Sequence, residues 1–176
     1  NAGHFDCDVT IAREFVSTFS APDVLVFWSE LEIPLCRVPH VATHIWHRSN
    51  VNGRPYEAIY HFASDCLKRR SNVLSHAAVF NGVGPGCSEY LGHPTQKPVA
   101  LMQALIALTD GTVFDPFMGV GATGIACIRT VRKFLGIEKD PTYYATALAR
   151  IQRELAQGVL FPPAPAAPIT VNQELA

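Results

Sequence analysis

Apolar residues recur at two spacings along the chain, and these spacings predict alternating helices and strands. The first third begins with a helical stripe at i, i+4 and i+8, made of Ile11, Phe15 and Phe19. A continuous apolar run follows at 24–28, which is typical of a strand buried on both faces in a parallel sheet. Two more strands are predicted at 43–47 and 56–62, with turn residues between them.

The second half alternates more clearly. Pro98 opens a helix that Gly111 closes. Its apolar stripe consists of Val99, Met102, Leu105 and Ile106. A strand at 112–115, a helix from about residue 123 and a strand at 134–137 follow.

Asp140 and Pro141 begin the last predicted helix, and Gly158 closes it. Its stripe consists of Tyr144, Leu148, Ile151 and Leu155. Strands alternating with helices predict an α/β fold with a doubly wound, Rossmann-like sheet, in a single domain over residues 1–160. Residues 161–176 form a Pro/Ala-rich tail.

Residues 63–92 interrupt the alternation, because neither spacing is visible there. The stretch contains the basic run Lys68-Arg69-Arg70 and a Gly/Pro-rich segment at 81–86. A loop of about thirty residues in a compact domain is usually functional or disordered. We therefore predict an interaction loop at 63–92.

Composition excludes several classes of protein. The chain has 176 residues, is 48% hydrophobic and carries a formal net charge of −1, which suits one globular domain. No apolar stretch approaches eighteen residues and no basic-then-apolar leader opens the sequence, which argues against membrane and secretory proteins. Five scattered cysteines without a Cys-x-x-Cys pair favour reduced thiols in a cytoplasmic protein.

Seven histidines raise the question of a metal site. His44 and His47 lie in one predicted strand at a spacing that places them on opposite faces, and no cysteine or carboxylate stands at ligand spacing from them. We therefore expect no metal.

The most specific chemistry lies in a glycine-rich segment after the strand at 112–115. It reads Asp115-Pro116-Phe117-Met118-Gly119-Val120-Gly121-Ala122-Thr123-Gly124. Glycines let the backbone approach a nucleoside, and Glu138, after the next strand, can hold ribose hydroxyls. The G-x-G-x-x-G match also fits a nicotinamide-dependent oxidoreductase. However, the Asp115 carboxylate would repel a pyrophosphate, whereas it suits the cationic groups of S-adenosylmethionine.

Both acids after the second strand have a structural alternative. Glu138 could be a solvated acid at a strand end, although the glycine segment before it favours ribose binding. Asp140 precedes Pro141, so a helix N-cap is at least as good an interpretation as a ligand contact.

Two strings in a fixed order resemble one enzyme family. His93-Pro94-Thr95-Gln96-Lys97-Pro98 precedes the Asp115 segment, and this order resembles the amino-methylating DNA methyltransferases of the β arrangement, whose cofactor motif follows their catalytic motif. Upstream, Trp46-His47-Arg48-Ser49-Asn50 and Glu57-Ala58-Ile59 resemble the family's Trp-basic-x-Asn and Glu-x-Ile strand pair. The resemblance covers residues 1–157 and is most specific over 93–138.

The resemblance implies S-adenosylmethionine as cofactor and methyl transfer to an exocyclic amine, adenine N6 or cytosine N4, in double-stranded DNA. It is compatible with a restriction-system partner. It places Thr95 and Lys97 near the methionine end of the cofactor; alternatively, Thr95 caps the next helix and Lys97 is solvated. The residues expected to bind cofactor are Thr95, Lys97, Asp115, Pro116, Phe117, Gly119, Gly121, Glu138 and Asp140.

Target recognition would fall in the 63–92 loop. Its basic residues Lys68, Arg69 and Arg70 could neutralise DNA phosphates, which positions a protein without reading sequence, and a solvated charge run is an equal alternative. A second basic group is expected on an exposed helix end. It consists of Arg129, Arg132 and Lys133.

One family motif is missing. These enzymes carry Asp-Pro-Pro-Tyr or Ser-Pro-Pro-Tyr, which binds the exocyclic amine and stacks on the flipped base, and no such string occurs here. The resemblance places the motif upstream of Asn1. We therefore expect an N-terminally truncated chain that is inactive alone, and we assign no catalytic residue. A non-catalytic module that binds cofactor or DNA is the alternative.

Overall fold

The computed structural model describes most of the chain between residues 21 and 157. The described residues are 14, 17–18, 21–28, 36–50, 56–64, 71–79, 87–157 and 170–171. The chain divides into two compact units, one of Asn1–His47 and Tyr56–Leu74, the other of Arg48–Pro55 and Ser75–Ala176.

Little of the first predicted helix is described. Glu14, Ser17 and Thr18 have helical backbone, and the two hydroxyls donate to the Glu14 carbonyl at 2.8 and 3.0 Å. The stripe residues Ile11, Phe15 and Phe19 lie outside the described residues.

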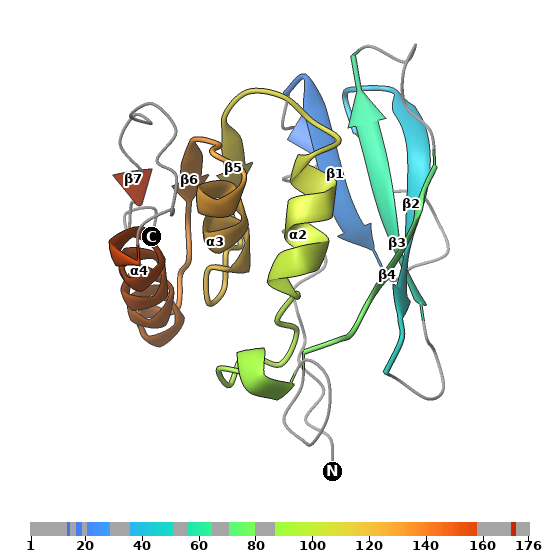
Figure 1. Ribbon diagram of the computed structural model, residues 1–176. Coiled ribbons are helices and arrows are strands. Elements are labelled where there is room, and N and C mark those ends of the chain that lie inside the picture. The colour runs from blue at the N-terminus through green and yellow to red at the C-terminus, as the bar shows by residue number, and fades with distance from the viewer. Residues whose placement is uncertain are drawn as a thin grey trace. The chain divides into compact units, whose positions relative to one another are not determined.

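The first sheet has four strands in the order β1-β3-β2-β4 (Figure 1). The strands are β1 (Asp23–Trp28), β2 (His40–Arg48), β3 (Tyr56–Ala63) and β4 (Val73–His76). β3 is antiparallel to both β1 and β2. The three predicted strands are therefore confirmed to within a few residues at their ends.

Two predictions about this sheet were wrong. β1 was expected to be a strand buried within a parallel sheet, but it stands at the end of the strand order, pairs antiparallel with β3, and is mostly half-buried. β4 lies in the 63–92 stretch that was predicted to lack regular structure. Its four residues alternate between exposed and half-buried, and so short an alternation does not stand out in sequence.

Two histidines are buried in this sheet, and a chain of hydrogen bonds satisfies them. The Asn72 N–H donates to Nδ1 of His44 at 3.2 Å, so Nε2 carries the proton of a neutral His44. Nε2 of His44 lies 3.2 Å from Nδ1 of His61, whose Nε2 lies 2.9 Å from Oδ1 of Asp23. The consistent assignment has each imidazole donating from Nε2 toward Asp23. His47 is exposed, which confirms that it faces away from His44.

The second unit is a strand–helix–strand–helix arrangement. It consists of α2 (Val99–Ile106), β5 (Val113–Asp115), α3 (Ala122–Arg129), β6 (Phe134–Gly136), α4 (Pro141–Ala156) and β7 (Thr170–Val171). β5, β6 and β7 form a parallel sheet in that order. α3 packs against α2, α4 and β6 (Figure 1). These elements confirm the predicted α/β class.

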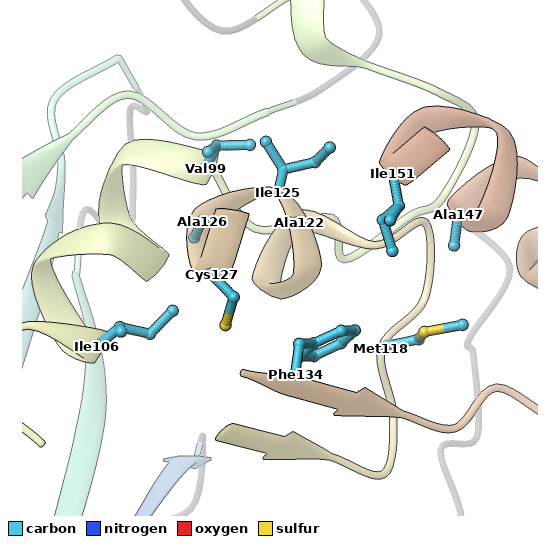
Figure 2. Close-up of a cluster of buried hydrophobic side chains, with 10 residues drawn as sticks. All are labelled: Val99, Ile106, Met118, Ala122, Ile125, Ala126, Cys127, Phe134, Ala147 and Ile151. Carbon is cyan, nitrogen blue, oxygen red and sulfur yellow. The ribbon is translucent and has the colours of Figure 1, made fainter. Parts of the chain in front are cut away.

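Small residues bring α3 and α4 together. A Cβ added to Gly121 would lie 3.0 Å from Cβ of Ala147, and one added to Gly124 would lie 2.6 Å from Cδ1 of Ile151. Figure 2 shows both α4 side chains within the hydrophobic core of the unit, with Ile151 on the side of Ile125 and Ala147 beyond it. The core consists of Val99, Ile106, Met118, Ala122, Ile125, Ala126, Cys127, Phe134, Ala147 and Ile151.

The two predicted helix stripes that fall within the described residues hold with one exception. Val99, Leu105 and Ile106 are buried in α2, but Leu155 of α4 is 51% exposed. α4 ends at Ala156, five residues after Ile151, its last buried residue, and Gly158 lies outside the described residues.

Arg132 was wrongly expected on an exposed helix end. Its guanidinium donates to the carbonyls of Gly111 (2.7 Å), Ile106 (3.1 Å) and Thr109 (2.7 Å), so it caps the end of α2. Arg129 does lie near the surface, where it pairs with Glu154 at 2.6 Å.

Candidate functional site

A tight turn between β5 and α3 forms the centre of the site. Gly119 and Gly121 have φ of 52° and 81°, which favours glycine at both positions. The Met118 N–H donates to the Ile137 carbonyl at 3.0 Å and so ties the turn to the segment after β6. Gly121 is the N-cap of α3 and allows the contact with Ala147. The structure therefore gives Gly121 a packing role, and its contact with cofactor remains a prediction.

Asp115 is fixed at the end of β5 by two donors. Its Oδ1 accepts from the Phe117 N–H at 3.0 Å, and its Oδ2 accepts from the Thr123 hydroxyl at 2.5 Å. Burial raises the pKa of Asp115, the two hydrogen bonds oppose that rise, and the charge of Glu138 adds to it. A carboxylate held in this way can face a cation without rearranging.

The Glu138 carboxylate links the turn to the start of α4. Its Oε2 accepts from the Gly119 N–H at 2.9 Å, and its Oε1 accepts from the Asp140 N–H at 2.9 Å. Each oxygen accepts one backbone donor and retains acceptor capacity. This carboxylate is therefore fixed in orientation and able to accept from two adjacent hydroxyls.

Asp140 is confirmed as a helix cap. Its Oδ1 accepts from the N–H groups of Thr142 (2.8 Å) and Tyr143 (3.0 Å) at the start of α4. The second interpretation, a direct ligand contact, remains a prediction.

His93 lies against the turn. A Cβ added to Gly119 would lie 3.2 Å from Nε2 of His93, and the imidazole meets the Tyr143 ring edge-to-face with centroids 4.6 Å apart. The Thr95 N–H donates to Nδ1 of His93 at 3.3 Å. Burial lowers the pKa of His93, the nearby charges of Glu138 and Asp140 oppose that shift, and Lys97 adds to it.

Thr95 does not cap the following helix. The N-cap of α2 is Pro98, which offers no side-chain acceptor, and the Val99 N–H instead donates to Oε2 of Glu89 at 3.2 Å. The alternative role of Thr95 is therefore wrong. Thr95 is exposed and Lys97 is half-buried.

The structure joins some of the predicted cofactor-binding residues by hydrogen bonds and leaves others half-buried or exposed. Gly119, Glu138 and Asp140 are joined by hydrogen bonds. Asp115 stands at the start of the same turn, Pro116 is half-buried and Phe117 is 59% exposed. Sequence reasoning missed His93, Glu89, Gln96 and Thr123 as organising side chains. Three of them had a visible signal: His93 and Gln96 belong to the string at 93–98, and Thr123 follows Gly121 by two residues.

The predicted DNA contacts Lys68, Arg69 and Arg70 lie outside the described residues. Among the residues that the structure does describe, no cluster of three or more His, Cys, Asp or Glu could hold a metal ion. Within the same part of the chain, no helix is long and apolar enough to cross a membrane.

Comparisons with known proteins agree with this geometry. Residues 2–149 match a family model described as DNA methylase. The chain is 42% identical over 66 residues to the DNA adenine methyltransferase YhdJ of Escherichia coli K12, covering 36% of this chain and 22% of that protein. It is 30% identical over 117 residues to the type II methyltransferase M2.DpnII of Streptococcus pneumoniae, covering 64% of this chain and 42% of that protein. The chain thus spans less than half the length of both curated relatives.

A solved structure shares the fold. The M1.HpyAVI–SAM complex superposes with a TM-score of 0.57 at 23% identity, covering 83% of this chain and 84% of that one. At this identity the likeness concerns the fold alone.

Proposed function

The chain belongs to the DNA methylase family, and from this premise we propose that it binds S-adenosylmethionine at the turn between β5 and α3. The observation that carries the proposal is the Glu138 carboxylate, which accepts from Gly119 in the turn at 2.9 Å and keeps acceptor capacity for a ribose diol.

The charges at the site favour a methyl donor over a dinucleotide. The Asp115 carboxylate at the start of the turn would repel a pyrophosphate. The ammonium and sulfonium of S-adenosylmethionine would instead be attracted to Asp115. Thr95 and Lys97 belong to the segment whose His93 lies against the turn, and Phe117 offers an exposed ring beside it. The cofactor would be held by Asp115, Thr95, Lys97 and Phe117 together with the Glu138 carboxylate.

The reaction that we propose is methyl transfer to adenine N6 or cytosine N4 in double-stranded DNA. The bound cofactor supplies an already activated methyl group. The contribution of this chain is to fix the donor in one orientation and to exclude water from it. Lys68, Arg69 and Arg70 would contact phosphates, and the 63–92 stretch would approach the target. A relationship to a restriction system is part of the same proposal, because M2.DpnII carries a type II name.

We propose no catalytic residue. The sequence contains no Asp/Ser-Pro-Pro-aromatic string to bind the target base. The second candidate function is a module that binds cofactor or DNA without transferring the methyl group. Label transferred to DNA when the chain is incubated with labelled S-adenosylmethionine and duplex DNA would exclude the second candidate.

Calorimetric titration with S-adenosylhomocysteine tests the cofactor site, with NADH as the competing ligand. We expect saturable binding of the first ligand alone. Glu138→Gln and Asp115→Asn should weaken it at least roughly tenfold, since each removes a charged acceptor. Asp110→Asn makes the same change at an exposed residue and should bind like wild type. Saturable NADH binding without a response to S-adenosylhomocysteine would instead identify a nicotinamide enzyme.

A further inference from the structure

Residues 89–99, which we call the strap, are closed into a compact loop by a buried amide. Gln96 is 5% exposed. Its Nε2 donates to the Glu89 carbonyl at 2.6 Å, and its Oε1 accepts from the Leu91 N–H at 3.0 Å. A buried side-chain amide with both ends satisfied fixes the backbone groups that it bonds. Gln96 therefore sets the shape of the loop between Glu89 and its own position.

A second bond closes the end of the strap at α2. Oε2 of Glu89 accepts from the N–H of Val99, the first residue of that helix, at 3.2 Å. Arg150 of α4 lies 3.9 Å from the same oxygen and donates to the Val120 carbonyl in the glycine turn at 3.3 Å. The strap is thus linked to both the turn and α4.

The strap also touches the cofactor turn directly. His93 lies within the loop that Gln96 closes, and its Nε2 would be 3.2 Å from a Cβ on Gly119. The backbone N–H of Gln96 donates to the His93 carbonyl at 3.3 Å. Thr95 and Lys97 flank Gln96 in sequence, so the backbone that Gln96 anchors is the one that carries both candidate ligands.

We infer that Gln96 is a positioning residue of the cofactor site. It makes no ligand contact itself, but it holds the strap in its bound shape before the ligand arrives. A preformed segment loses little conformational freedom on binding, whereas an open one must be ordered at the expense of affinity. The inference rests on the proposed S-adenosylmethionine site, and it assigns Gln96 the role of fixing the strap in the shape that this site needs.

Two substitutions separate the two bonds of the amide. Gln96→Glu has the same shape and keeps the acceptor for Leu91, but it places a carboxylate oxygen against the Glu89 carbonyl. Gln96→Met removes both bonds. We expect the dissociation constant for S-adenosylhomocysteine to rise about tenfold in Gln96→Glu and further in Gln96→Met. Gln152→Glu makes the same chemical change on the exposed surface of α4 and should bind like wild type.

The readouts distinguish positioning from general stability. Binding is measured by calorimetry well below the unfolding midpoint of every variant, and hydrogen exchange is followed at the Leu91 amide. That amide should stay protected in wild type and Gln96→Glu and exchange faster in Gln96→Met. A residue with only a structural role would lower the unfolding midpoint without changing the affinity of the folded protein.

Each outcome has a clear meaning. Wild-type affinity in Gln96→Glu and Gln96→Met overturns the inference and leaves the cofactor site standing. A wild-type chain that does not bind S-adenosylhomocysteine overturns the site itself, and the inference with it. If Gln96→Met does not fold, the Gln96→Glu variant, which retains the Leu91 bond, decides the question by its affinity alone.

Discussion

The Thr123 hydroxyl on α3 donates a 2.5 Å hydrogen bond to Oδ2 of Asp115 at the end of β5. Thr123 is 5% exposed, so this bond is largely shielded from water. Burial raises the pKa of Asp115, and the Thr123 donor is the strongest of the contacts that oppose the rise. The first turn of α3 therefore fixes the direction of the carboxylate and limits the rise in its pKa.

We predict that Thr123→Val weakens binding of S-adenosylhomocysteine by roughly tenfold at neutral pH, because valine has the same shape but no donor. Without the donor the pKa of Asp115 rises further, so the loss should grow as the pH falls. Thr123→Ser keeps the hydroxyl and should stay near wild type. Calorimetry at neutral and mildly acidic pH measures both.

The control for this experiment is Thr146→Val, since the Thr146 hydroxyl donates to the Thr142 carbonyl within α4 at 2.8 Å. It should not affect binding. Equal affinity of Thr123→Val and wild type at both pH values would show that the bond does not govern the carboxylate.

The second unit was largely predictable because its signals are local. Pro141 after Asp140 specifies a capped helix start, and the structure confirms the cap through the Thr142 and Tyr143 N–H groups. The glycine turn was predictable because glycines stand at positions 119 and 121 of the sequence. The φ values of 52° and 81° found at these positions favour glycine over other residue types. The sequence did not reveal that Gly121 also allows α3 to pack against Ala147, because these two residues are 26 positions apart in the chain.

Gly124 provides a test of the helix contact. Gly124→Ala places a Cβ 2.6 Å from Cδ1 of Ile151 and 3.0 Å from Cε1 of Phe134. We predict a loss of about 1–3 kcal/mol in the free energy of unfolding, measured by urea denaturation. Ile151→Val removes the clashing methyl, so the double variant should recover part of the loss. Additive effects of the two changes would show that the contact is not the cause.

The first sheet was less predictable because its pairing is set by distant residues. The apolar run in β1 is compatible with several sheet positions, and its antiparallel partner β3 begins 28 residues after Trp28. Arg132 shows the same limit. Its charge suggested an exposed position, but it bonds carbonyls at Ile106, Thr109 and Gly111, which are separated from it by 21 to 26 residues.

The buried pair His44 and His61 makes stability depend on pH. Burial, together with the neighbouring His61, lowers the pKa of His44 to about 4 from 6.5. In the unfolded chain the residue takes up a proton near its ordinary value, whereas in the folded chain it resists protonation until about pH 4. Acidification between these values therefore favours unfolding, and this contribution to stability is complete above pH 6.5.

We predict that this residue accounts for up to about 3 kcal/mol of the stability lost on acidification. Carboxylates titrate in the same range, so the quantity to measure is the difference between wild type and His44→Asn. Asparagine can place its amide oxygen near the former Nδ1 and accept from Asn72 without titrating. Urea denaturation across the acidic range should give a shallower slope for His44→Asn.

His47→Gln is the matched control, because His47 lies on the same strand but is exposed. Its slope should equal that of wild type. If His44→Asn also kept the wild-type slope, protonation of His44 would not be what destabilises the fold. The carboxylate of Asp23, which accepts from His61 at the other end of the chain of hydrogen bonds, would then be the group to substitute next. Oδ1 of Asp23 is the acceptor on which the orientation of both imidazoles depends.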